Sequence, residues 1–244
     1  SDGKVDIALN MFGKIDGFQV PDGEILLFER GEDWTDWSHS FLLENGDGYK
    51  WPNGSEAHDI DGDGDLDLAV GGGFLTCQLF PWTSSCGSVF WLEQTGDEWK
   101  IHDIVAPGAD VFFHHPLFLD VDLDGIEDVV AIGESFAGPM GTTAQSEVRL
   151  YKGEDGKGGF SAEYEIIAEG LGSLPQLWDV DQDGDEDLVS AEYFIEAKED
   201  WDGASFVWLE NPGSADGSWT RHIIDDSIGP AIQFLMVDNA FGDG

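Results

Sequence analysis

Closely spaced aspartates are the residues of this chain that could do chemistry. The pattern Asp-x-Asp-x-Asp-Gly-x-x-Asp occurs at 59–67, 120–128 and 179–187, and a fourth copy is divided between residues 1–6 and 238–244. Carboxylates this dense repel one another unless a cation lies among them. Oxygen ligands at this spacing are typical of a calcium loop. The pattern therefore predicts calcium as the cofactor.

An EF-hand is the alternative origin of such a loop. It requires an acidic residue at loop position twelve and a helix after it. The residues at that position are Val70, Ala131 and Ser190, and strand-like sequence follows each of them. The EF-hand alternative therefore fails.

The elements that position these loops recur with the same period. The central aspartates are Asp2, Asp63, Asp124, Asp183 and Asp243, about 60 residues apart, which is typical of repeat proteins. The first strand-like segment after each loop lies at 67–72, 128–133 and 187–191. The second lies at 24–29, 89–93, 147–151 and 206–210. The third lies at 37–43, 99–104, 164–168 and 219–224. A last strand leads into the next loop, as at 116–120 and 174–179. One antiparallel sheet per repeat cannot bury its own faces, so the sequence predicts an all-β fold, a β-propeller of four-stranded antiparallel blades.

The repeats resemble the FG-GAP/VCBS repeats of integrin α-subunit heads and of secreted microbial proteins. The acidic loops carry the resemblance, together with the Trp-Leu-Glu-Asn strand at 208–211 and the Trp-x-x-His strands that begin at Trp99 and Trp219. It covers essentially the whole chain. It implies metal ligands at Asp59, Asp61, Asp63, Asp65 and Asp67; at Asp120, Asp122, Asp124, Ile126 and Asp128; and at Asp179, Asp181, Asp183, Asp185 and Asp187, with Asp65, Ile126 and Asp185 acting through backbone carbonyls. We expect the ions to fasten blade hairpins.

The family usually closes its ring with about seven blades. We therefore expect residues 1–244 to form a single propeller region that is part of a longer propeller, with about four blades present. The predicted repeats are 1–58, 59–119, 120–178 and 179–237, and a further repeat starts at 238–244. The alternative is that the last strand completes the first sheet and closes a four-bladed ring.

Composition limits the partners and the compartment. The chain has 10 basic and 51 acidic residues, a formal net charge of −41. A surface with this much negative charge repels nucleic acid, and we therefore expect no nucleic-acid partner. No apolar stretch is long enough to span a bilayer, so direct membrane insertion is not expected. A disulfide between Cys77 and Cys86 would fit an extracellular calcium protein, and two free thiols are the alternative.

Long connections at 12–23, 73–88, 134–146 and 193–205 are expected on the face opposite the acidic loops. Aromatic rings and carboxylates gather there, which suits sugar rings with apolar C–H faces and hydroxyl groups. The predicted ligand-binding residues are Trp51, Trp82, Phe112, His114, His115, Glu134, Tyr193 and Trp201. Packing of these rings against one another is the alternative.

The predicted function is an extracellular, calcium-stabilised binding or adhesion module for a glycan or an extracellular protein. No catalytic residue is predicted, and an enzyme is not the favoured interpretation. One alternative is a lyase or dehydratase acting on sugars, which would require His58, His114 and His115 to converge. Another alternative is a structural spacer in a surface assembly. His102 and His222 recur three residues after a tryptophan, which predicts a packing role for them.

Overall fold

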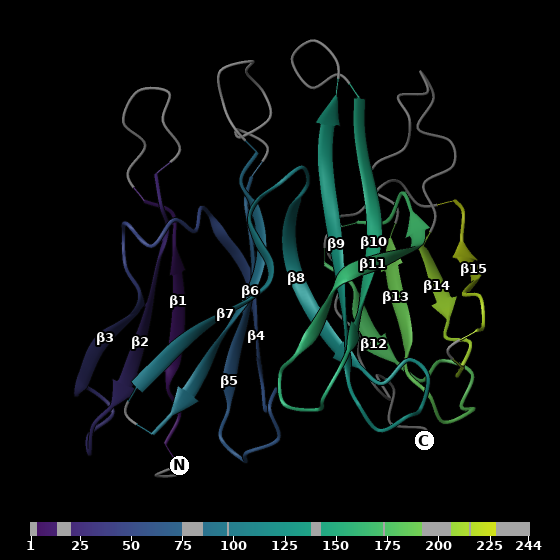
Figure 1. The fold of residues 1–244 in the computed structure, drawn as a ribbon. Coiled ribbons are helices and arrows are strands. Elements are labelled where there is room, and N and C mark those ends of the chain that lie inside the picture. The colour runs from purple at the N-terminus through teal and green to yellow at the C-terminus, as the bar shows by residue number, and fades with distance from the viewer. Residues whose placement is uncertain are drawn as a thin grey trace.

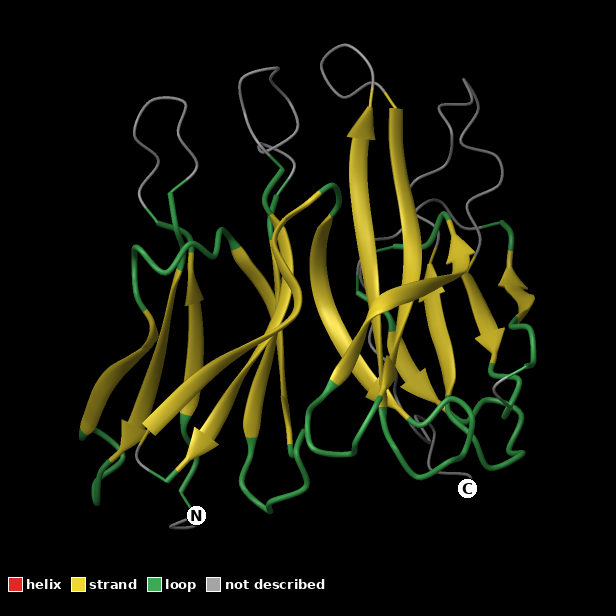
Figure 2. Cartoon of the chain, in the orientation of Figure 1, coloured by secondary structure: helices red, strands yellow, loops and turns green. Residues whose placement is uncertain are grey.

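The computed structural model describes residues 4–13, 21–74, 85–96, 98–137, 143–172, 174–191, 206–214 and 216–227. Every regular element in these ranges is a β-strand (Figure 2). The strands form one three-stranded and three four-stranded sheets, and all pairs are antiparallel. The described part of the chain contains no helix with the length and apolarity needed to cross a membrane.

Each sheet is formed by strands that are consecutive in the sequence (Figure 1). Sheet 1 contains β1 (Ile7–Met11), β2 (Glu24–Arg30) and β3 (Trp37–Leu43). Sheet 2 contains β4 (Pro52–His58), β5 (Asp67–Gly72), β6 (Gly87–Thr95) and β7 (Glu98–Ala109). Sheet 3 contains β8 (Phe112–Leu119), β9 (Asp128–Ala137), β10 (Thr143–Gly153) and β11 (Phe160–Glu169). Sheet 4 contains β12 (Gln176–Trp178), β13 (Asp187–Ala191), β14 (Phe206–Glu210) and β15 (Thr220–Asp225).

These sheets confirm the predicted all-β class, and their arrangement as propeller blades stays a prediction. In sheets 2, 3 and 4 the first strand enters an acidic loop and pairs with the strand that leaves it. The segment 134–146 was expected to be a loop, but its two ends continue the β9–β10 ladder, with Glu134 opposite Ser146 and Ala137 opposite Thr143. The hairpin pairing extends beyond the apolar run because antiparallel hydrogen bonds do not require apolar side chains.

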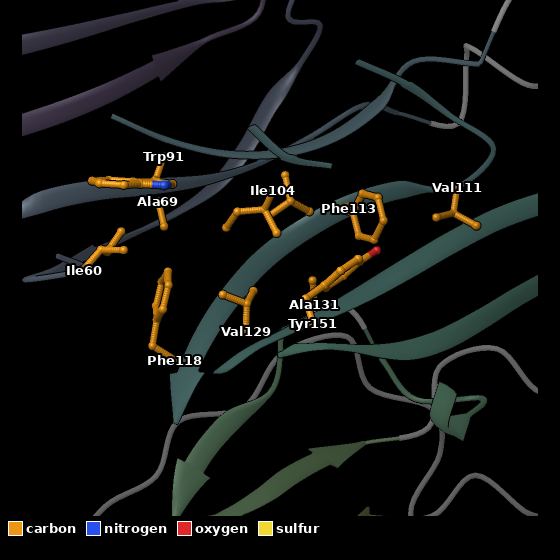
Figure 3. Packing of buried hydrophobic residues seen from close by; sticks show 11 residues of the cluster. Ile60, Ala69, Trp91, Ile104, Val111, Phe113, Phe118, Val129, Ala131 and Tyr151 are labelled. Atoms are coloured by element: carbon orange, nitrogen blue, oxygen red, sulfur yellow. The ribbon is translucent and has the colours of Figure 1, made fainter. Parts of the chain in front are cut away.

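The sheets pack face to face in chain order, with one apolar cluster between each consecutive pair. The cluster between sheets 1 and 2 includes Ile25, Leu43 and Phe90. The cluster between sheets 2 and 3 includes Ala69, Trp91, Phe113 and Val129, as Figure 3 shows, and the cluster between sheets 3 and 4 includes Ile132, Leu150, Leu188 and Leu209. The alternation along β5 explains this pattern: Leu68 and Val70 face sheet 1, and Ala69 faces sheet 3. The middle strands are therefore apolar on both faces.

Each sheet also carries a pair of rings that face each other on its last two strands. The pairs are Phe28 with His39, Trp91 with His102, Tyr151 with Tyr164, and Trp208 with His222, with ring centroids 5.5, 4.5, 5.6 and 4.3 Å apart respectively. In two of them the histidine Nε2 also lies 2.6 Å from a glutamate, Glu93 for His102 and Glu210 for His222. The predicted packing role of His102 and His222 is confirmed.

Candidate metal centres

Three groups of aspartates could hold a metal ion, and they lie in the β4–β5, β8–β9 and β12–β13 loops. In each group, carboxylate oxygens from three residues all lie within 4.8 Å of one another. The groups are Asp59, Asp61 and Asp67; Asp120, Asp122 and Asp124; and Asp179, Asp181 and Asp187. The first two loops lie at the lower end of the sheets in Figure 2. Asp63, Asp128 and Asp183, also predicted as ligands, are not members of these groups.

The last aspartate of each loop is buried and ties the loop to the third strand of its sheet. The Asp67 carboxylate accepts hydrogen bonds from the backbone N–H of Ile60 at 3.0 Å and of Gln94 at 2.9 Å. Asp128 and Asp187 accept from the same repeat positions, namely Val121 and Gly153 for Asp128, and Val180 and Asn211 for Asp187. The exposed fractions of the three aspartates are only 0–2%. These carboxylates therefore satisfy backbone donors both in their own loop and on the third strand.

The other carboxylates are oriented by the turn itself. The Asp59 carboxylate accepts the Gly64 N–H at 3.1 Å, and Asp61 and Asp63 accept the N–H of the residue two positions later. The chain bends sharply at Gly64, where φ is 97°. Equivalent bends occur at Gly125 and Gly184, with φ of 89° and 107°. Such left-handed values favour glycine.

Sequence reasoning missed a second left-handed position, the fourth residue of each loop. Its φ is 73° at Gly62, 58° at Leu123 and 65° at Gln182. A left-handed conformation is uncommon for side chains that are not glycine, asparagine or aspartate. Gly62 was the only sequence signal of this bend, because the other two loops carry ordinary residues there.

The electrostatics of the loops fit a divalent cation. The Oδ1 atom of Asp59 is buried and accepts no hydrogen bond among the described residues. Burial raises the pKa of Asp67 and of Asp187, although backbone hydrogen bonds act in the opposite direction. Burial, followed by repulsion from neighbouring aspartates, raises the pKa of Asp185 to about 6. The side-chain ligands on offer are all carboxylate oxygens, which hard divalent cations prefer. A cation here would offset both the burial of these carboxylates and their mutual repulsion.

The second loop differs from the others because a lysine enters it, a feature that sequence reasoning missed. Lys152 Nζ lies 2.9 Å from Asp122 Oδ2 and 2.8 Å from Asp128 Oδ2. Burial acts to lower the pKa of Lys152, but the hydrogen bonds to these two carboxylates outweigh it, so the pKa is raised. The lysine therefore stays charged between two of the predicted ligands.

At the opposite end of the sheets, rings from three sheets form a continuous row that we call the aromatic row: Phe12, Trp51, Phe74, Phe112 and His114. Successive ring centroids are 4.6, 4.6, 6.3 and 5.6 Å apart. Trp51 has a left-handed φ of 49°, which is rare for a bulky residue. Trp51 and Phe112 are buried, whereas Phe12 is 52% exposed. The row therefore reaches solvent at Phe12.

Polar atoms without partners lie beside this row. His114 Nε2 is 3.3 Å from Glu134 Oε2, but the two atoms are not aligned for a hydrogen bond. Four buried atoms, Trp51 Nε1, Asn10 Oδ1, His114 Nε2 and Glu134 Oε1, have no hydrogen-bond partner within the described ranges. Nearby, Asn53 Nδ2 donates to the backbone oxygens of Gly73 and Phe113. Buried polar atoms normally have partners, so these four atoms are exceptions to the general rule.

The histidines of the enzyme alternative do not converge in the described structure. His58 Nε2 lies 2.5 Å from Glu127 Oε2, and His115 Nε2 lies 3.0 Å from Glu56 Oε2. His114 faces Glu134 instead. Each histidine therefore has its own carboxylate, and the metal-binding groups found among the described residues contain no histidine.

Four of the predicted residues lie outside the described residues: Trp82, Tyr193, Trp201 and Cys77. Cys86 is buried. The disulfide between Cys77 and Cys86 stays a prediction. The structure brings four of the predicted ligand-binding residues to the same end of the sheets: Trp51, Phe112, His114 and Glu134. His115 contacts a different carboxylate, that of Glu56.

Comparison with known proteins does not identify a family for this chain. The chain matches no protein-family model and no curated protein. The resemblance to FG-GAP/VCBS repeats therefore stays a prediction that rests on the acidic loops and the repeated strands.

Proposed function

We propose that this chain is a β-propeller region whose acidic loops bind calcium and whose opposite face binds glycans outside the cell. The serial packing of the four sheets supports the propeller, because neighbouring blades of a propeller bury their faces against one another in chain order. Calcium is the proposed ion because loops of this spacing bind it through oxygen at about 10⁻⁴ to 10⁻³ M, a concentration found outside cells.

The observation that carries glycan binding is the group of buried, unpartnered polar atoms beside the aromatic row. A sugar offers hydroxyl groups that can donate to Glu134 Oε1 or accept from Trp51 Nε1. It also offers an apolar C–H face that can stack on a ring such as Phe12, the exposed end of the row. Aromatic surface combined with a few polar groups is the usual composition of a small-ligand site.

A glycan array tests the proposal. The protein is applied in calcium and in EDTA, and binding to a defined sugar that is stronger in calcium is the expected result. Phe12→Ala should weaken that binding about tenfold or more, because ring stacking is lost. Trp34→Ala is the matched control, since Trp34 is an exposed ring, 77% accessible, in the β2–β3 turn at the other end of sheet 1. Absence of binding to every soluble and polymeric glycan, or equal effects of the two substitutions, would refute glycan binding at this face.

A further inference from the structure

The three acidic loops share one backbone arrangement but differ in the side chain delivered to them by the third strand. Gln94, Gly153 and Asn211 donate their N–H to the last aspartate of the loop. The residue just before each donor is Glu93 in sheet 2 and Glu210 in sheet 4. At the equivalent position in sheet 3 the residue is Lys152. The second loop is thus the one where a positive charge replaces a negative one.

The contacts of these three residues also differ. Glu93 and Glu210 each lie 2.6 Å from the histidine on the neighbouring strand. Lys152 bonds instead to Asp122 and Asp128, in the acidic loop of its own sheet. An ammonium in that position supplies positive charge to carboxylates that would otherwise repel each other.

The aspartate groups differ in the corresponding way. In the first and third loops the group of converging oxygens includes the buried last aspartate, Asp67 or Asp187. In the second loop the group consists of Asp120, Asp122 and Asp124, and Asp128 is not part of it. Asp128, the carboxylate that is absent from the converging group, lies 2.8 Å from Lys152 Nζ.

We propose that Lys152 is a built-in counter-ion of the second loop, so that this loop binds a divalent cation more weakly than the first and third loops do. The inference rests on the proposed binding of calcium by the acidic loops. To enter the second loop with its full set of ligands, the cation must displace the ammonium from Asp122 and Asp128. Hydrogen bonds between charged groups are the strong ones, so their loss weakens binding about tenfold or more.

Isothermal titration of the EDTA-stripped protein with calcium chloride tests this. The expected result for the unmodified chain is a tighter class of sites that contains the first and third loops, and a class at least about tenfold weaker that contains the second. Lys152→Met keeps the aliphatic stem and removes the charge, and it should bring the weak site into the tight class. Lys100→Met is the control. The Lys100 side chain is 52% exposed, and its Nζ lies 3.6 Å from Glu93 Oε1, away from the aspartate groups.

Lys152→Arg keeps the charge and should leave the weak site weak, which also provides a folded comparison if Lys152→Met lowers stability in EDTA. Assignment of the sites uses Asp122→Asn, which should remove the weak class and leave the tight class in place. Three sites of equal affinity in the unmodified chain, or a weak site that persists in Lys152→Met, would overturn the role of Lys152 and leave calcium binding intact. Failure of every loop to bind calcium would instead overturn the proposed metal sites themselves, and the role of Lys152 with them.

Discussion

Replacement of Asp67 by alanine separates the structural role of a loop carboxylate from its role toward a cation. The side chain is 2% exposed and accepts two backbone N–H groups, from Ile60 and Gln94. Each buried donor left without a partner costs about 1–3 kcal/mol. Burial raises the pKa of Asp67, so removal of the charge relieves part of that cost. We therefore expect Asp67→Ala to lower the free energy of unfolding by about 2–4 kcal/mol in EDTA.

The matched control is Asp63→Ala, in the same loop. Asp63 is exposed and its carboxylate accepts one N–H, from Asp65, in an exposed turn. In EDTA this substitution should cost no more than about 0.5 kcal/mol, as surface changes usually do. Urea unfolding followed by tryptophan fluorescence measures both variants, with and without calcium. If the two substitutions cost the same in EDTA, the buried hydrogen bonds of Asp67 do not stabilise the apoprotein and the reasoning is refuted.

Two further predictions concern the ring pairs on neighbouring strands and the pH dependence of stability. His102→Ala removes the ring stack and the contact with Glu93, and should lower the free energy of unfolding by about 1–2 kcal/mol; an unchanged urea midpoint would contradict this. The folded-state pKa of Asp185 is raised to about 6 from the ordinary 3.8, so its protonated form contributes stability that is complete below about pH 3.8 and is lost as the pH rises through about 6. In EDTA, Asp185→Asn should therefore flatten the fall of the melting temperature between pH 4 and 7, and a parallel pair of curves would count against it.

Local signals in the sequence were enough to predict most of the strands and the acidic loops, but not the extension of the β9–β10 ladder into residues 134–146. Alternation and turn residues located the strand runs, and the spacing of Asp59, Asp61 and Asp67 located the first aspartate group. These features depend on residues close in sequence, where geometry follows from spacing.

Contacts between distant residues were not predictable in this way. The entry of Lys152 into the second loop depends on the register of β10 against β9, and nothing in the acidic motif encodes it. The same holds for the contact between His58 on β4 and Glu127 in the second acidic loop, which are 69 residues apart in the sequence. The aromatic row was only partly foreseen, because sequence placed Phe12 and Trp51 on one face without showing that their rings would stack.

The three apolar clusters have a consequence for how the described sheets come apart. Each cluster joins two sheets that are neighbours along the chain, so the loss of sheet 1 removes one cluster and leaves the other two in place. Unfolding can then advance stepwise from an end, and its energetics are a sum over single sheets and the contacts between adjacent ones. Amide hydrogens of β5, β6, β9 and β10, the middle strands of the two sheets that have a sheet packed on either side, should exchange last.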